Sequence, residues 1–166
     1  MRLFTRLLKF IAYGLFFFIL AVLVRTFIAE PVSIEGVSMN PTLHDSELVL
    51  SSPIPYYFHD PKQGDIVIFN APDKDAIYIK RVIGEEDQTV DIKNSKYYIN
   101  NKVLSEPYIT EETLPTNESH WSVPDDHVFV SGDNRTNSTD SRVFGPIAKD
   151  RIRGKVILRF KPFSLL

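Results

Sequence analysis

The chain has 166 residues, no cysteine, 43% hydrophobic residues and a formal net charge of −2, and this length suits a single domain. The near-neutral charge argues against a nucleic-acid-binding protein, which would normally carry a basic face. The lack of cysteine excludes disulfides, thiolate metal sites and a cysteine nucleophile, and the four histidines lack the spacing of metal ligands, so we expect no metal.

The charge is divided between a short basic head and a long acidic body. Residues 1–30 hold four basic residues and one acidic residue, whereas residues 31–166 hold 15 basic and 20 acidic residues and all 11 prolines. In the head, fifteen uncharged residues lie between Lys9 and Arg25, and apolar residues continue to Ala29. A helix over residues 10–29 would be about 30 Å long, enough to cross a bilayer if Arg25 reaches the headgroups. Pro31 would then stop the helix.

Three interpretations of the head are a cleavable signal, a buried core helix and an uncleaved signal-anchor. A cleavage site needs small residues, but the candidate here begins with the bulky Phe27. A buried helix of this length is rarely apolar on every face. We therefore predict a single-pass anchor in the cell membrane over residues 10–29. The basic residues keep residues 1–9 cytoplasmic, which places residues 31–166 outside.

The body is predicted to be all-β, because short runs rich in β-branched and aromatic residues alternate with turn residues. Asn100 and Asn101 tolerate the positive φ of a tight hairpin turn within Tyr97–Val103. The polar stretch Ser105–Asp126 is expected to be a long loop. The predicted strands are Glu47–Leu50, Asp65–Phe69, Ile77–Ile83, Thr89–Ile92, Lys96–Ile99, His127–Ser131 and Gly154–Phe160.

Three segments could carry chemistry: Gly36–Leu43, Tyr78–Gly84 and the Asp-, Asn- and Arg-rich loop Gly132–Gly145. A serine such as Ser38 needs a base to become a nucleophile, and without a suitably placed histidine a lysine can supply it. Burial of Lys80 among Ile77, Ile79, Val82 and Ile83 would lower its pKa, as a base requires. Taken singly, however, each residue is more often structural, and an anchored, non-enzymatic β module stays open.

The joint order of the motifs is more specific than any one of them. The chain runs through Gly-x-Ser-Met-x-Pro-Thr-Leu (36–43), Gly-Asp-Ile-Val-Ile-Phe (64–69), Tyr-Ile-Lys-Arg-Val-Ile-Gly (78–84) and Gly-Asp-Asn-Arg-x-Asn-Ser-x-Asp-Ser-Arg-x-x-Gly (132–145). Together with the anchor, this series resembles bacterial type I signal peptidases, of the short Gram-positive-like type. The resemblance implies a mainly β, barrel-like catalytic domain. The family's second domain would be reduced to a short insertion within residues 85–131.

The resemblance also implies roles for individual residues. Ser38 would be the nucleophile, Lys80 the general base, and Ser138 the hydroxyl that orients the lysine. The backbone N–H of Ser38 would form part of the oxyanion hole. Some family members carry a serine as a second donor where this chain has Gly36. A structural network of ion pairs and hydrogen bonds would comprise Asp133, Arg135, Asp140 and Arg142.

The implied activity is removal of signal peptides from secreted preproteins after small residues of the Ala-x-Ala type, through an acyl-enzyme and without a cofactor. The substrate would lie along the edges of Val32–Val37 and Ile77–Ile79 as an added strand. Ile34, Gly36, Met39, Leu43 and Ile79 would shape its pockets. The implied partners are signal peptides and the phospholipid bilayer. Other Ser–Lys peptidases are the alternatives: self-cleaving repressors lack an anchor, and a conjugation-pilin processing peptidase is closer.

Overall fold

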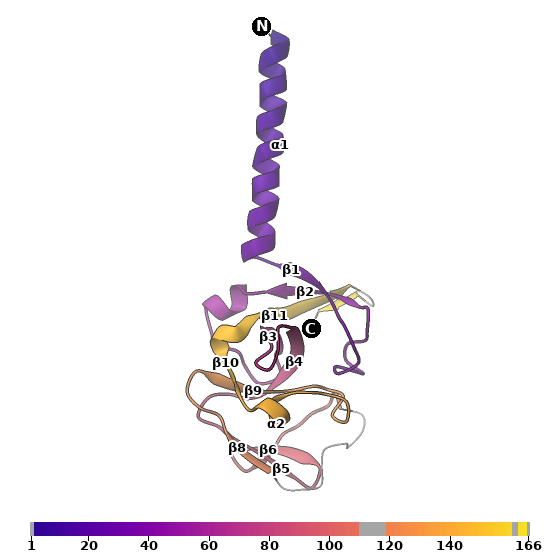
Figure 1. Ribbon diagram of the computed structural model, residues 1–166, viewed down its shortest axis with the longest axis vertical. Helices are drawn as coiled ribbons and strands as arrows, with labels where there is room; N and C mark the ends of the chain where they lie inside the picture. Colours follow the sequence, from indigo (N-terminus) through magenta and orange to yellow (C-terminus); the bar gives the residue numbers. More distant parts are fainter. Residues whose placement is uncertain (1, 110–118, 161–162, 166) are drawn as a thin grey trace.

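The computed structural model describes residues 2–109, 119–160 and 163–165. A long helix, α1 (Arg2–Phe27), precedes a β body, from which it projects in Figure 1. The later short helices are η1 (Ile54–Tyr57), α2 (Ser141–Phe144) and η2 (Lys149–Arg151). The strands are β1 (Glu30–Ser33), β2 (Leu48–Ser52), β3 (Ile66–Asn70), β4 (Ile77–Gly84), β5 (Thr89–Lys93), β6 (Lys96–Ile99), β7 (Lys102–Val103), β8 (Ser119–Ser122), β9 (His127–Ser131), β10 (Ile147–Ala148), β11 (Ile152–Phe160) and β12 (Phe163–Leu165).

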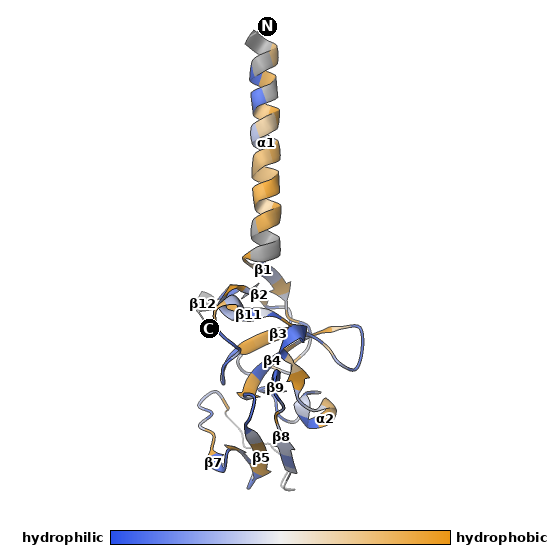
Figure 2. Ribbon diagram, turned by 90° about the vertical axis from the view of Figure 1, so that its left-hand side faces the viewer, coloured by the Kyte–Doolittle hydropathy of each residue, from blue (hydrophilic) through white to orange (hydrophobic). Residues whose placement is uncertain are grey.

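The predicted helix is present, but it ends at Phe27 rather than at Ala29. Glu30 already pairs with Ser51 as the first residue of β1, and the carbonyl of Ile28 accepts a hydrogen bond from the Ser52 hydroxyl. The middle of α1 is predominantly apolar (Figure 2). Judged on the residues whose side chains are described, no helix is both long and apolar enough to cross a membrane.

The strands form two antiparallel sheets, which confirms the mainly β prediction. The large sheet has the order β1-β2-β11-β3-β4-β9-β10, with β12 paired to β11, and the small sheet has the order β7-β6-β5-β8. Register shifts in β11 and at the Val82/Gly84 step of β4 interrupt the ladders of the large sheet, and such bulges bend a sheet. The small sheet lies at the end of the body away from α1 (Figure 1).

Strand β3 explains how the large sheet is buried on both faces. Ile66 and Ile68 pack in one apolar cluster with Met39 and Leu43, whereas Val67 and Phe69 pack in another on the opposite face. Successive strand residues point to opposite faces, so a run that is apolar throughout fits a strand covered on both sides. A third apolar cluster, here called the small-sheet core, surrounds the fully buried Tyr97 of β6. Its other buried members are Ile83, Val90, Ile92, Val123 and Phe129.

The predicted strands are all present, and their ends differ from the predicted ones by at most two residues. The hairpin is also confirmed, since Asn100 and Asn101 have φ values of 49° and 63° between β6 and β7. The prediction of one long loop over Ser105–Asp126 is wrong in part, because Ser119–Ser122 forms β8. Trp121 of this strand packs on the small-sheet core while its polar neighbours cover the outside. Residues 110–118 of that stretch lie outside the described residues.

Candidate active site

Ser38 lies in the loop that joins β1 to β2, here called the Ser38 loop (residues 34–47). The loop closes on itself, since Ile34 N donates to Glu47 O and Ser46 N donates to Ile34 O. Gly36 has φ +86°, which favours glycine, and its N–H donates to Asp45 Oδ1 over 2.6 Å. This hydrogen bond lowers the pKa of Asp45. The glycine therefore shapes the loop two residues before Ser38.

Lys80 of β4 reaches the Ser38 hydroxyl. Its Nζ donates to Ser38 Oγ over 2.7 Å and to the carbonyl of Ile79 over 3.0 Å. The side chain is buried, with 4% of the residue exposed. Burial lowers the pKa of Lys80 to about 8, which outweighs the opposing charges of Asp140 and Asp133. Much more of this lysine is therefore neutral near neutral pH than of a lysine in water.

The surroundings of Lys80 differ in part from those expected. Ile77 is 49% exposed and Ile83 packs in the small-sheet core, so these two residues do not bury the ammonium. The ring of Tyr78 instead lies 5.2 Å from Lys80 Nζ. Arg81 reaches a different, polar environment, as the alternation along a strand predicts: it bonds to Asp133 and to the carbonyl of Gly64.

The 132–142 loop packs directly on the Ser38 loop. Asn134 donates from its backbone N to Ser38 O over 3.0 Å and from its side chain to Val37 O over 3.1 Å. Ser138 Oγ is buried and has no hydrogen-bond partner among the described residues. The predicted hydrogen bond from Ser138 to Lys80 is therefore not formed in this arrangement.

Gly132 is a site residue that the sequence analysis missed. A Cβ added there would lie 2.3 Å from Ser138 Oγ and 2.5 Å from the carbonyl oxygen of Ser38. The second contact is with a backbone atom, so the clash could be relieved only if the Ser38 loop moved. The glycine before Asp133 in the motif was the available signal, since glycine permits close approach of two backbones.

Replacing Gly132 by alanine should displace Ser38 and reduce turnover. A misplacement of about 1 Å can cost about 100-fold in rate, and we expect a fall in kcat of that order. Steady-state kinetics of the hydrolysis expected of Ser38 and Lys80 would measure it. Gly14→Ala is the matched control, because a Cβ at Gly14 meets nothing within 4 Å, and it should keep the wild-type kcat. A wild-type kcat for Gly132→Ala would contradict the steric role.

The four residues expected to form a polar network are all buried or largely buried. Asp133 pairs with Arg81, and Asp140 pairs with Arg142. Asp140 also accepts hydrogen bonds from Ser131 Oγ, Gly132 N and the backbone N of Arg142 at the start of α2. Burial opposes ionisation of Asp140, but Arg142 holds its pKa below the usual value. Arg135 pairs with Glu106, a partner that the sequence analysis did not identify.

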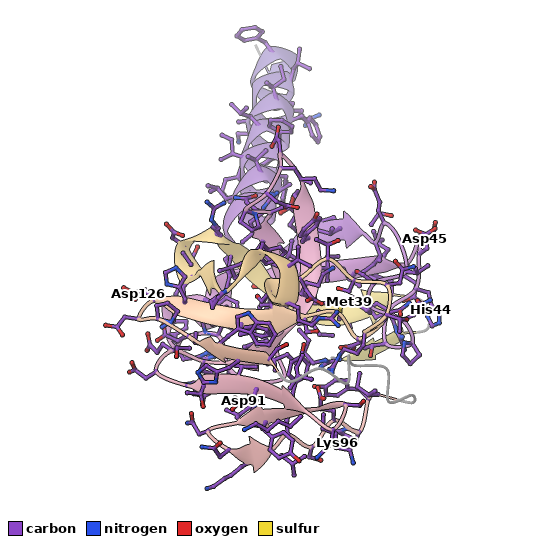
Figure 3. The ribbon with its side chains drawn as sticks, turned by 60° about the horizontal axis from the view of Figure 1, so that its bottom comes forward. Met39, His44, Asp45, Asp91, Lys96 and Asp126 are labelled. Carbon is purple, nitrogen blue, oxygen red and sulfur yellow. The ribbon has the colours of Figure 1, made fainter. Side chains whose placement is uncertain are left out.

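A groove of about 910 Å³ lies beside Ser38. Ile34, Met39 and Ile79 line it, as predicted, and Met39 lies well inside the body in Figure 3 while Asp45 lies at its edge. Two predicted pocket residues do not line it. Leu43 is fully buried in the core cluster beneath, and Gly36 is turned toward Asp45. Residues of the groove that were missed include Ala71, Tyr78, Arg151 and Arg153.

Two strand edges border the groove. Strand β1 is the terminal strand of the large sheet and pairs only with β2 among the described residues. Strand β4 pairs with β3 on one side, and with β9 on the other side only over Arg81–Gly84. The second edge of Ile77–Lys80 therefore has no partner strand among the residues that the structure describes. An extended peptide could hydrogen-bond to such edges. Within the described residues, no three histidine or carboxylate side chains are grouped as a metal site would require.

Comparison with known proteins gives consistent matches. The family model described as signal peptidase, peptidase S26, matches residues 7–161. Signal peptidase I T of Bacillus subtilis is 41% identical over 156 residues, covering 88% of this chain and 81% of the relative. A probable signal peptidase I-1 of Synechocystis is 40% identical over 157 residues, covering 88% and 78%. The crystal structure of a signal peptidase I from Enterococcus faecalis superimposes with a TM-score of 0.54 at 29% identity, covering 59% of this chain and 97% of that chain.

Proposed function

Since the chain belongs to the signal peptidase family, peptidase S26, we propose that it removes signal peptides from preproteins, with Ser38 as nucleophile and Lys80 as general base. Family membership makes it a hydrolase of the serine protease type. The observation that carries the residue roles is the 2.7 Å hydrogen bond between Lys80 Nζ and Ser38 Oγ. It lies beside a groove bordered by two strand edges that have no partner strand among the described residues.

In the proposed reaction, neutral Lys80 accepts the hydroxyl proton as Ser38 Oγ attacks the scissile carbonyl. The tetrahedral intermediate collapses to an ester on Ser38, and the Lys80 ammonium gives its proton to the leaving amine of the mature protein. Lys80 then takes a proton from water, whose oxygen attacks the ester. As this second tetrahedral intermediate collapses, the Lys80 ammonium returns the proton to Ser38 Oγ, and the signal peptide leaves with a free carboxyl group. The burial that lowers the lysine pKa to about 8 provides the neutral base for both steps.

The proposed oxyanion donor is the backbone N–H of Ser38. Gly36 has no side chain that could donate, and its own N–H is already engaged by Asp45. The Asp45 contact therefore removes the Gly36 amide as a second donor in this proposal. Ser138 is proposed to orient Lys80 once substrate has rearranged the site, because its hydroxyl is buried beside Gly132.

The proposed specificity is for small residues one and three positions before the cut, as in Ala-x-Ala. The peptide would extend between the β1 edge and the Ile77–Lys80 edge, and Ile34, Met39 and Ile79 would form the floor of its pockets. Met39 and Ile34 are almost fully buried. Their packing against Leu43 and the large-sheet core leaves them little freedom to retreat from a large side chain.

We also propose that the head anchors the enzyme in the cell membrane, with residues 1–9 cytoplasmic and the β body outside. The supporting observation is that apolar side chains along α1 are exposed, from 74% for Phe10 to 43% for Leu20. An exposed apolar surface of this extent is costly in water. Anchoring would also raise the effective concentration of membrane-inserted preproteins near Ser38.

The test is cleavage of a purified preprotein whose signal peptide ends in Ala-x-Ala. N-terminal sequencing of the product should place the cut after the second alanine. Replacement of that alanine by phenylalanine should reduce kcat/KM by about 100-fold or more, because overpacking a rigid pocket is strongly unfavourable. Equal cleavage of the two substrates, or cutting elsewhere, would contradict the proposed specificity.

A further inference from the structure

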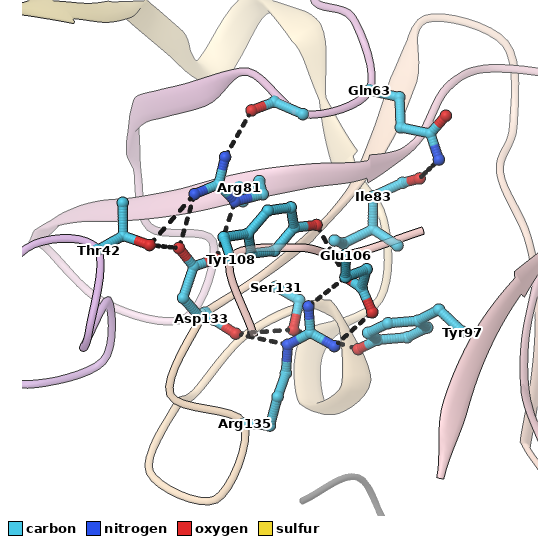
Figure 4. A network of polar contacts seen from close by, with 12 residues as sticks. Thr42, Gln63, Arg81, Ile83, Tyr97, Glu106, Tyr108, Ser131, Asp133 and Arg135 are labelled. Carbon is cyan, nitrogen blue, oxygen red and sulfur yellow. Dashed lines mark hydrogen bonds and ion pairs between the residues drawn. The ribbon is translucent and has the colours of Figure 1, made fainter. Parts of the chain in front are cut away.

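A short segment that leaves the small sheet reaches across to the active site. This 104–109 segment follows β7, and its Leu104 still belongs to the small sheet, donating to Tyr97 O and packing on the small-sheet core. Four residues later, Tyr108 lies over Arg81 of β4, in the large sheet. The segment therefore contacts both sheets, and its Glu106 and Tyr108 lie close to Arg81 and Arg135 (Figure 4).

Glu106 binds the 132–142 loop through Arg135. Its two carboxylate oxygens accept from Arg135 Nη1, over 3.1 Å, and from Arg135 Nη2. The ion pair is buried, since only 11% of the Glu106 side chain and 1% of the Arg135 side chain are exposed. Burial alone would lower the pKa of Arg135, but Glu106 raises it, so the pair stays charged. A buried bidentate pair of this kind fixes its two partners in one relative orientation.

Tyr108 binds β4 at the residue next to Lys80. The Arg81 guanidinium lies 3.8 Å from the centre of the Tyr108 ring, and the phenol donates to Glu106 Oε1 over 2.8 Å. Burial raises the pKa of Tyr108 above its usual value, so the phenol keeps the proton that it donates. Arg81 in turn bonds to Asp133 over 2.9 and 2.7 Å. Glu106 and Tyr108 thus join Arg81 of β4 to Arg135 of the 132–142 loop.

The two ends of this connection hold the two reacting side chains. On one side, Arg135 donates to Gly132 O, and the loop of Gly132 and Asn134 holds the carbonyl of Ser38. On the other side, Arg81 and Lys80 are consecutive residues of β4. A shift of the 132–142 loop relative to β4 would therefore change the distance between Ser38 Oγ and Lys80 Nζ.

We propose that Glu106 and Tyr108 are positioning residues, which set the Ser38–Lys80 distance by clamping the 132–142 loop to β4. The proposal rests on the proposed function of Ser38 and Lys80. It gives the insertion that carries the small sheet a part in catalysis, although none of the insertion's described residues lines the groove.

The test is the kinetics of Glu106→Gln on a preprotein. We expect kcat to fall about tenfold, since small displacements of reacting groups have effects of this size, and KM to stay unchanged because Glu106 does not line the groove. The pH midpoint of kcat should not move, because the charges that act on Lys80 are those of Asp140, Asp133 and Arg142. Tyr108→Phe keeps the ring over Arg81 and should lose about threefold, whereas Tyr108→Ala should lose about tenfold.

Glu85→Gln is the matched control, since Glu85 also accepts two hydrogen bonds, from Lys62 and Gln63, away from the 132–142 loop. It should keep the wild-type kcat. A wild-type kcat for folded Glu106→Gln, or a loss confined to KM, would overturn the proposal. If Glu106→Gln does not fold, equal kcat values for Tyr108→Ala and wild type would overturn it. Failure of the proposed function itself would be distinct, because wild type and Glu85→Gln would then leave the preprotein uncut as well.

Discussion

Replacing Lys80 by methionine should lower kcat by about 1,000-fold or more, because it removes the general base while keeping most of the length of the side chain. Lys80 Nζ is the described group that hydrogen-bonds to Ser38 Oγ, and a serine hydroxyl without a base is a poor nucleophile at neutral pH. Turnover of a preprotein by the purified variant would measure the loss. Lys93→Met, in the small sheet, is the matched control and should retain wild-type turnover.

The Lys80→Met variant should also be at least as stable as the wild type near neutral pH. Lys80 has a folded pKa of about 8, below the value of about 10.4 in an unfolded chain. Below pH 8 both states bind the proton, so the cost of burying the ammonium is fully present. Between the two pKa values only the unfolded state binds it, and the stability of the wild type rises with pH.

Thermal unfolding of both proteins at two pH values would measure this difference. The stability advantage of Lys80→Met should be larger near pH 7 than near pH 10, where wild-type Lys80 is largely neutral. A variant that has lost both activity and the cooperative unfolding transition would not support a role for Lys80 as base. Retained cleavage by a folded Lys80→Met enzyme would contradict that role outright.

The second large effect is on the pH dependence of kcat/KM. Lys80 acts as a base only when neutral, and burial brings its pKa to about 8. The rate should therefore rise about tenfold per pH unit below this value and level off above it, giving about 50-fold between pH 6 and pH 8 and about 100-fold between pH 6 and the plateau. Substrate binding shifts the midpoint if it buries the lysine further, so kcat/KM is the parameter that reports the free enzyme.

The measurement is a pH profile of kcat/KM with a preprotein, over the range from about pH 6 to about pH 10. A flat profile would argue against a lysine base. A midpoint near 6.5 would indicate a histidine instead, since that is its usual pKa. The folded state should be verified at each end of the range by the thermal transition, because the buried Asp140 and Arg142 also form a charged pair.

Much of the site could be predicted because its residues lie in short, dense motifs. Ser38 and Lys80 are 42 positions apart, yet they form a hydrogen bond, and strand alternation alone separates the environments of Lys80 and Arg81. Most of the strands could also be predicted from the sequence, because they are apolar runs between turn residues. Strand β8 was not predicted, because its residues are polar except for Trp121, which packs on the small-sheet core.

The residues that were missed depend on contacts between distant segments. Nothing in the sequence near Glu106 shows that its partner is Arg135, because an ion pair across 29 positions leaves no local pattern. Leu43 was assigned to a pocket because it is apolar and near Ser38, but the core beneath the groove buries it. Gly132 could have been found only by knowing how closely two loops approach.

The central claim is that Ser38 is the nucleophile that Lys80 activates, and its most direct test is the Ser38→Ala enzyme. The substitution removes only the oxygen that accepts from Lys80 Nζ at 2.7 Å, so the fold should survive, as its thermal unfolding would show. Incubated with a preprotein that the wild type cleaves, the folded variant should leave the signal peptide attached. Cleavage by Ser38→Ala at the same bond and a comparable rate would contradict the account.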